Sequence, residues 1–128
     1  MAVTYSTAGR GLVVDLIDNT IGAATMFIGW GTGGSSTGST ATISDTALQA
    51  EATESRATTV VSQPTADTNQ WVGTLTNQKA GGKIIEEVAV LSASTAGTLL
   101  IRSTHGGVSV ATGDSIQYTI TLQQSSTQ

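Results

Sequence analysis

The chain has 128 residues, a length typical of one domain, with no cysteine and a formal net charge of −4. The lack of cysteine excludes disulfides and thiolate metal ligands, and the five scattered Lys and Arg residues exclude a basic surface for nucleic acid. Only 11% of the residues are charged, against roughly 25% in an ordinary globular domain. Ser, Thr, Asn and Gln supply the polarity instead, so contacts of this surface should depend little on salt.

No stretch reaches the roughly 18 apolar residues of a membrane span. Residues 1–10 lack the basic flank and apolar run of a signal peptide. We therefore expect a soluble protein that is made in a cytoplasm. The fifteen glycines, together with many Thr and Val residues, favour strands joined by turns.

The N-terminal part is predicted to contain a short extended arm (1–5) followed by a helix. Ser6 or Thr7 can cap this helix, and Asn19-Thr20 would end it. Its apolar residues recur at helical spacing and form one stripe: Leu12, Val13, Leu16, Ile17 and Ile21. A buried strand is the alternative, because Leu12-Val13-Val14 contains β-branched residues.

Residues 25–30 are predicted to form a strand that runs into a glycine-rich stretch, Gly29-Trp30-Gly31-Thr32-Gly33-Gly34. A Trp between two glycines predicts the close approach of another backbone segment. Residues 33–42 are polar and of low complexity, which predicts an exposed, flexible Ser/Thr/Gly loop. Thr46 and Gln49 match a capping box, so a short helix is expected to start at residues 45–49.

After Arg56 the apolar residues recur with a period of two. Strands are expected at 57–63 (ended by Pro64), 70–77, 83–91, 98–104 and 116–122, with a short segment at 108–110 between glycine turns. Both faces of 83–91 are apolar, as in a central strand, whereas 116–122 has one apolar and one polar face. Residues 123–128 are a polar tail. The sequence predicts one all-β domain over residues 1–128, an antiparallel sandwich with one N-terminal amphipathic helix.

No catalytic, cofactor-binding or metal-binding residues are predicted. His105 is the only histidine and lies beside two glycines in an expected surface turn, so it has no companions for a metal site. The Gly29-x-Gly31-x-Gly33 spacing lacks the Lys-Ser/Thr of a phosphate loop. We expect no enzymatic activity.

Glutamates and tryptophans are the remaining candidates for chemistry. Four glutamates could supply paired carboxylates for glycoside hydrolysis: Glu51, Glu54, Glu86 and Glu87. Ion pairing is the favoured interpretation, with Glu51 or Glu54 bound to Arg10 or Arg56, and Glu87 bound to Lys83. Trp30 and Trp71 could stack on a sugar, but both lie on apolar strand faces and are expected in the core.

A series of short motifs runs through roughly residues 9–122. They are Gly9-Arg10-Gly11-Leu12, Asp15-Leu16-Ile17, Phe27-Ile28-Gly29-Trp30-Gly31-Thr32-Gly33, Asp45-Thr46-Ala47-Leu48 with Glu51, Glu54 and Arg56, Val72-Gly73-Thr74, residues 85–91, Gly97-Thr98-Leu99-Leu100-Ile101-Arg102, and Gly113-Asp114-Ser115-Ile116-Gln117-Tyr118. In this order the motifs resemble a family of small virion structural proteins of tailed bacteriophages.

The resemblance implies a structural role on the head or the tail of a virion. Small size, low charge and the lack of a fibre repeat or coiled coil favour a capsid decoration (cement) protein. Such proteins resemble β-sandwiches or jelly rolls, lie on the outer surface of the capsid, and hold neighbouring major capsid subunits together. A tail or tail-fibre structural protein is the alternative, and a carbohydrate-binding module with Trp30 or Trp71 as its stacking platform is a further one.

The expected partners are the major capsid protein and further copies of this chain, as a homodimer or homotrimer, with no nucleic acid and no membrane. The expected contact surfaces are the segments with little to hold them inside one chain, namely residues 1–5, 33–42 and 123–128.

Overall fold

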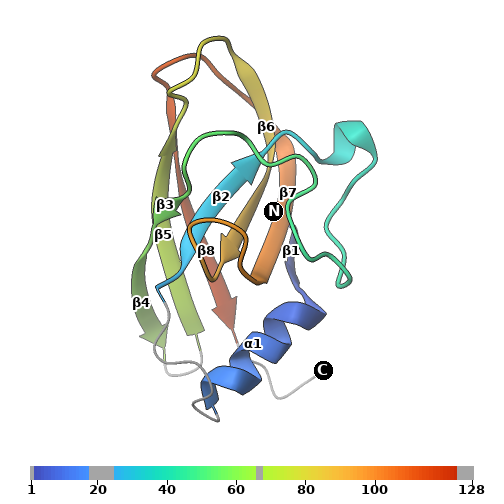
Figure 1. The fold of residues 1–128 in the computed structure, drawn as a ribbon, viewed down its shortest axis with the longest axis vertical. Helices are drawn as coiled ribbons and strands as arrows, with labels where there is room; N and C mark the ends of the chain where they lie inside the picture. Colours follow the sequence, from blue (N-terminus) through green and yellow to red (C-terminus); the bar gives the residue numbers. More distant parts are fainter. Residues whose placement is uncertain (1, 18–24, 66–67, 124–128) are drawn as a thin grey trace.

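The computed structural model describes residues 2–17, 25–65 and 68–123, and about half of these lie in strands of two antiparallel sheets (Figure 1). The elements are β1 (Ala2–Tyr5), α1 (Thr7–Ile17), β2 (Phe27–Gly31), the 3-10 helix η1 (Ser35–Thr37), β3 (Ala57–Thr58), β4 (Val60–Thr65), β5 (Thr68–Thr76), β6 (Lys83–Leu91), β7 (Leu99–Val110) and β8 (Ser115–Gln123). Sheet A has the order β1-β7-β6-β2-β3, and sheet B has the order β4-β5-β8. Within the described residues, no helix is long and apolar enough to cross a membrane.

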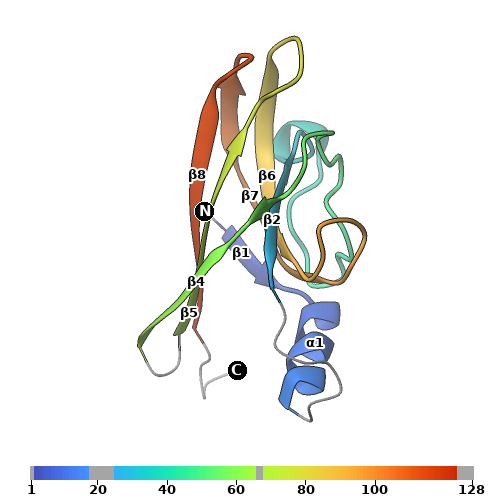
Figure 2. The ribbon, with the colours of Figure 1, turned by 60° about the vertical axis from the view of Figure 1, so that its left-hand side comes forward.

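The main core lies between the two sheets, which gives the sandwich-like architecture that the strand pattern predicts (Figure 2). Apolar side chains from both sheets meet there, among them Ile28, Trp30, Val88 and Val90 from sheet A and Trp71, Leu75, Tyr118 and Ile120 from sheet B. Alternation on β8 is confirmed, because Tyr118 and Ile120 are buried while Gln117, Thr119 and Thr121 are exposed. The predicted pattern of β5 is confirmed too: Trp71, Gly73 and Leu75 are buried on one side.

β6 is the central strand that its two apolar faces predict, since it pairs with β7 on one side and β2 on the other. Its residues are buried without interruption from Ile85 to Leu91. One face packs against sheet B. The other face is covered by Leu48, which packs with Ala89, Leu91 and Leu99 in a second apolar cluster.

The predicted break before residues 108–110 is wrong, because β7 continues through Gly106-Gly107 to Val110. The pairing with β6 shifts between Glu87–Thr104 and Ile85–Val108, so three residues of β7 lie opposite Glu86 alone. An irregularity of this kind takes up extra residues without ending the strand. Glycine therefore marks a bulge here and not a turn.

Pro64 was expected to end a strand, but it lies inside β4. The predicted strand over 57–63 is also two strands, with β3 in sheet A and β4 in sheet B. β4 forms an edge of sheet B, and its pairing with β5 is irregular between Ser62 and Thr65. Proline is tolerated at such a place because no ladder hydrogen bond needs its missing N–H.

The N-terminal arm belongs to the fold. Residues 2–5 form β1 and pair with β7 from Ala2–Thr104 to Tyr5–Ile101. α1 follows, and the Ser6 hydroxyl accepts a hydrogen bond from the Gly9 amide (2.9 Å), as a capping residue does. Leu12 of α1 is buried in the main core. The rest of the predicted apolar stripe, at residues 16, 17 and 21, lies outside the described side chains.

Candidate functional site

The segment 32–56 lies across the outer face of sheet A, on the side away from sheet B (Figure 2). The Thr32 amide donates to the Ala50 carbonyl (3.0 Å), and the Ala52 amide donates to the Trp30 carbonyl (2.9 Å). A Cβ atom at position 31 would lie 2.4 Å from both the Ala50 carbonyl oxygen and Glu87 Oε1. Glycine is required there by the close approach of a second backbone, which confirms the prediction made from the glycines beside Trp30.

Glu87 is the anchor of this covering segment. Its side chain is fully buried, and its carboxylate accepts hydrogen bonds from the backbone amides of Gly33 (3.2 Å), Gln49 (2.9 Å) and Ala50 (2.8 Å). The Gly33 amide lies at the start of the loop that leaves β2, and the amides of Gln49 and Ala50 lie where that loop returns to β2. A carboxylate bonded in this way ties both ends to β6, because breaking any of the bonds would leave a buried charge less well satisfied.

Arg102 of β7 provides the positive charge beside Glu87. Its Nε donates to Glu87 (2.8 Å), while its other nitrogens donate to Asp45 (2.8 Å) and to the Ser39 carbonyl (2.8 Å). The predicted pair of Glu87 with Lys83 is wrong. Four residues along one strand span about 13 Å, whereas Arg102 lies on the neighbouring strand, opposite Ala89.

The Asp45 carboxylate closes the turn in front of Arg102. Burial raises its pKa, but hydrogen bonds from the Thr42 amide and hydroxyl and from Arg102 outweigh that effect, so the pKa lies below its ordinary value of 3.8. The helix expected to start at 45–49 does not form: the Asp45 amide closes a turn by donating to the Thr42 carbonyl (3.2 Å), and the residues that follow make only bends. The tertiary ion pair with Arg102 holds Asp45 in a turn, and this contact overrides the local capping signal.

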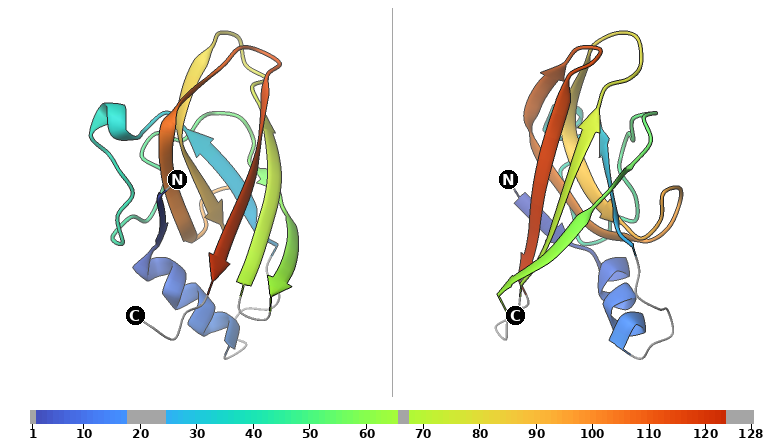
Figure 3. Two further views of the ribbon diagram at one scale, coloured as in Figure 1. Left: turned by 180° about the vertical axis from the view of Figure 1, so that it is seen from behind. Right: turned by 90° about the vertical axis from the view of Figure 1, so that its left-hand side faces the viewer.

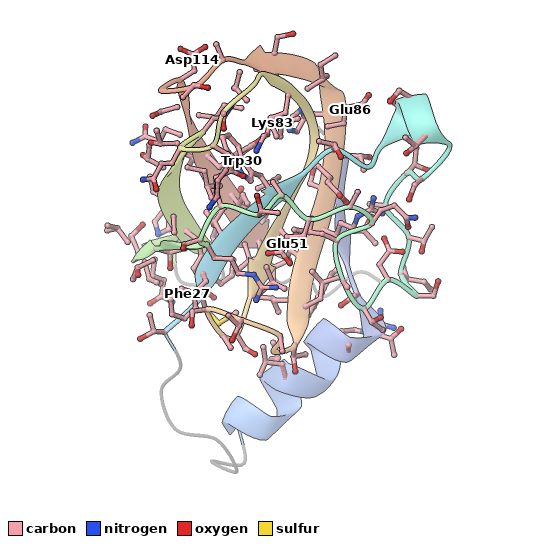
Figure 4. All side chains as sticks on the ribbon, turned by 45° about the horizontal axis from the view of Figure 1, so that its top comes forward. Phe27, Trp30, Glu51, Lys83, Glu86 and Asp114 are labelled. Atoms are coloured by element: carbon pink, nitrogen blue, oxygen red, sulfur yellow. The ribbon has the colours of Figure 1, made fainter. Side chains whose placement is uncertain are left out.

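A second charge pair joins the buried Glu54 to Lys83 of β6, whose side chain is partly exposed. Burial raises the pKa of Glu54, but the hydrogen bond from Lys83 leads the opposing effects, and the pKa lies below 4.5. The indole N–H of Trp30 contributes to this lowering, although neither it nor Glu54 Oε2 makes a hydrogen bond of normal geometry within the described residues. Figure 4 shows Trp30 and Lys83, the two residues whose side chains lower the pKa of Glu54.

Glu51 and Arg56 form the third pair, as the ion-pair interpretation predicts. Arg56 donates to both carboxylate oxygens (2.7 and 2.8 Å) and also to the carbonyls of Ala93 and Ala96 (2.8 Å each). This pair forms part of the wall of an open hollow of about 460 Å³, lined by Glu51, Thr53, Glu54, Ser55, Arg56, Ser94, Thr95 and Ala96. Since Arg56 bonds both to Glu51 and to the carbonyls of Ala93 and Ala96, the pair stabilises two loops.

Glu86, labelled in Figure 4, completes the set of candidate carboxylates. It accepts a hydrogen bond from the Ser36 hydroxyl of η1. Each of the four candidate glutamates thus has its own partner in the fold. Among the described residues, no group of three or more His, Asp or Glu side chains could hold a metal ion. The ionisable groups of this face hold loops onto sheet A.

His105 lies in β7 and is half-buried, so its placement in a surface turn is wrong. Its Nδ1 lies 2.7 Å from the Gly106 carbonyl oxygen and its Nε2 lies 2.9 Å from the Tyr118 hydroxyl. In the neutral imidazole the carbonyl fixes the proton on Nδ1, so Tyr118 donates to Nε2. Burial raises the pKa of Tyr118, and the bond joins sheet A to sheet B.

Both tryptophans are core residues, as expected: Trp30 is 1% and Trp71 is 6% exposed. Neither ring offers an open face on which a sugar could stack. The aliphatic side chains that do face solvent lie elsewhere, namely Ile43, Val60, Val61, Ile84 and Val108.

The expected contact surfaces have different outcomes. Residues 2–5 are held by β7 of their own chain, so the idea that only a neighbour could hold them is wrong. In the 33–42 segment, Gly33 and Gly34 are buried and residues 35–38 are exposed, so its first residues are part of the packed interior. Of the tail, only Gln123 is described, at the end of β8.

The ion pairs that Arg102 forms with Glu87 and Asp45 were not predicted from the sequence. A signal was present, because Arg102 follows the apolar run Leu99-Leu100-Ile101 and Glu87 stands in an apolar strand. A charge in a strand that is covered on both faces needs an opposite charge beside it.

No protein-family model matches the chain, and no curated protein compared with it matches it either.

Proposed function

We propose that this protein is a capsid decoration protein of a tailed bacteriophage, which binds the lattice of the major capsid protein and stabilises the head. The ordered motifs between residues 9 and 122 support this proposal through their resemblance to small virion proteins. In this account the chain is one domain, is made in the host cytoplasm, and ends up on the outer surface of the capsid.

The observation that carries the proposal is the use of the buried charges. Glu87 pairs with Arg102, and Glu54 pairs with Lys83. Arg102 also bonds to Asp45, and Glu87 accepts bonds from backbone amides of the same fold. Their ion pairs fix long loops onto a rigid sheet, which is what a protein needs when its function is to present a surface. An enzyme would instead keep such groups facing a substrate.

The exposed side of sheet B suits a permanent contact with another protein. Gln117, Thr119 and Thr121 are exposed on β8, and no charged residue lies in that strand. A standard interface of about 1,600 Å² is tight when well packed, and repetition over a capsid lattice multiplies modest contacts through avidity. Binding through such an uncharged surface should also withstand high salt.

The connectivity supports a jelly-roll-like arrangement as the finer description of the fold. β5 pairs with β8 and β6 pairs with β7, while β5 and β6 lie in different sheets, as do β7 and β8. The strands β5–β8 therefore behave as one two-stranded ribbon folded over both sheets, as in jelly rolls. The N-terminal helix covers one end of this sandwich as an amphipathic element.

Add-back to heads that lack the chain tests the proposal. Purified protein would be mixed with such heads at about 50 and 500 mM NaCl, values chosen to change the screening length severalfold. We expect saturable binding at both salt concentrations and a higher temperature of DNA release from the heads. Binding to isolated tails but not to heads would favour the tail alternative and would contradict the proposal.

A further inference from the structure

β4 is an exposed edge strand with unusual side chains for such a place. All six residues of Val60–Thr65 are exposed, and Val60 and Val61 are 72% and 52% exposed. Among the described strands, only β5 pairs with β4. Figure 3 shows β4 along the margin of the molecule, where another chain can reach it. Natural edge strands are usually protected by charge, by proline, by a bulge or by a covering segment. Of these β4 has Pro64 and the irregular pairing between Ser62 and Thr65, both in its second half, so that Val60 and Val61 are left unprotected.

Sheet B carries no charge in any of its strands. The sequences of β4, β5 and β8 contain no Asp, Glu, Lys, Arg or His, whereas the buried pairs described above lie on or over sheet A. In a two-fold contact each surface meets a copy of itself, so any charge near the axis would face a like charge. A charge-free edge is therefore self-complementary, and this favours a second copy of the chain over a charged partner.

The register of sheet B shows what a second β4 would cover. Val61 lies opposite Trp71, whose side chain is in the core, and Val60 lies opposite Val72. Opposite residues of an antiparallel pair share one face. A further strand beside β4 would therefore extend both faces of the sheet, and would remove two exposed valines from water.

We propose that two copies of the chain join through antiparallel pairing of their β4 strands, which makes one continuous six-stranded sheet across a two-fold axis. The six residues of β4 span about 20 Å, so the contact is smaller than the roughly 800 Å² per partner of a standard interface. The dimer should therefore depend on concentration. This inference goes beyond the proposed function: it selects a dimer over a trimer and needs no capsid.

Sedimentation of the purified chain over a range of concentrations tests the dimer. We expect the mean mass to rise from 12.9 kDa towards twice that value. Val61→Lys should raise the dissociation constant at least about tenfold, because pairing of the two β4 strands would bring two lysines close together and remove them from water. The control Thr119→Lys changes an exposed residue of the same sheet on β8 and should leave the dissociation constant unchanged.

Single cysteines locate the contact, because the chain has no cysteine of its own. Opposite residues on paired strands have Cα atoms about 4.5–5.5 Å apart, which suits a disulfide. Under mild oxidation, one of the variants Val60→Cys, Val61→Cys and Ser62→Cys should form a covalent dimer much faster than Thr119→Cys. A monomer at every concentration, a trimer, loss of the dimer in Thr119→Lys but not in Val61→Lys, or equal cross-linking of all four variants would overturn the proposal. Failure to bind heads would bear on the proposed function alone.

Discussion

Glu87 of β6 and Arg102 of β7 form an ion pair of 2.8 Å between two side chains that are almost completely buried, at 0% and 2% exposure. Each partner also binds the segment that covers sheet A: Glu87 through three backbone amides, and Arg102 through Asp45 and Ser39. The pair therefore joins the central strands to a long loop with little regular structure. The stability of the covering segment should depend on it.

Removal of the positive charge tests this dependence. Arg102→Met leaves Glu87 buried without its ion partner, and breaking a buried pair in this way costs about 3–5 kcal/mol. Urea unfolding should show this loss in the free energy of unfolding. The matched variant Arg10→Met changes an exposed arginine of α1 that bonds only to Thr7 among the described contacts, and it should cost less than about 1 kcal/mol. Equal losses in the two variants would contradict the anchoring role.

The close approach at Gly31 gives a second prediction. Gly31→Ala would place a methyl group 2.4 Å from Glu87 Oε1 and the Ala50 carbonyl oxygen, so we expect a loss of about 1–3 kcal/mol from overpacking. Gly106→Ala is the control, because a Cβ there would meet nothing within 4 Å. Thermal unfolding should separate the two variants by several degrees. A Gly31→Ala variant as stable as Gly106→Ala would show that segment 32–56 does not lie this close to β2.

Acid should weaken the fold through Asp45 and Glu54. Their pKa values in the folded chain lie below the ordinary values of 3.8 and 4.5, so the unfolded chain binds more protons as the pH falls through this range. The contribution of both groups is fully present above about pH 4.5 and is lost as the pH drops through their lowered pKa values. The melting temperature should fall between pH 5 and pH 3, and the fall should be smaller in Glu54→Gln. A melting temperature that stays constant over this interval would argue against both ion pairs.

Tryptophan fluorescence tests the carbohydrate-binding alternative. Because Trp30 and Trp71 are buried in the core, their emission should resist quenching by iodide and should not move when sugars are added. Unfolding in urea should make both rings accessible and so provides the positive control. A spectral shift that saturates with a sugar would place a binding face on one of these rings, in conflict with the packing between the sheets.

The strand pattern gave the all-β class, the central position of β6 and the buried face of β8, because these features follow from local alternation of apolar and polar residues. The glycines around Trp30 also predicted a close backbone contact. The covering segment could not be placed in this way. Its position depends on the bonds of Glu87, Arg102 and Asp45, which are far apart in the sequence and meet only after sheet A has formed.

The wrong predictions of local structure have one physical cause: contacts between residues far apart in the sequence outweigh the local propensity. Asp45-Thr46-Ala47-Leu48-Gln49 has a helix start signal, but the ion pair with Arg102 and the burial of Leu48 hold it in a non-helical conformation. Gly106-Gly107 looks like a turn, yet the long pairing of β6 with β7 carries the strand through it. Local propensity is a weak signal wherever such longer-range contacts are available.

The number of copies in the virion tests the central claim most directly. Under the proposed function a phage encodes this chain, and quantitative mass spectrometry of the particles of that phage would give the ratio of the chain to the major capsid protein. A decoration protein that repeats over the capsid lattice predicts hundreds of copies, in a fixed ratio to that protein. A handful of copies, a few dozen, or none in the purified virion would contradict the account.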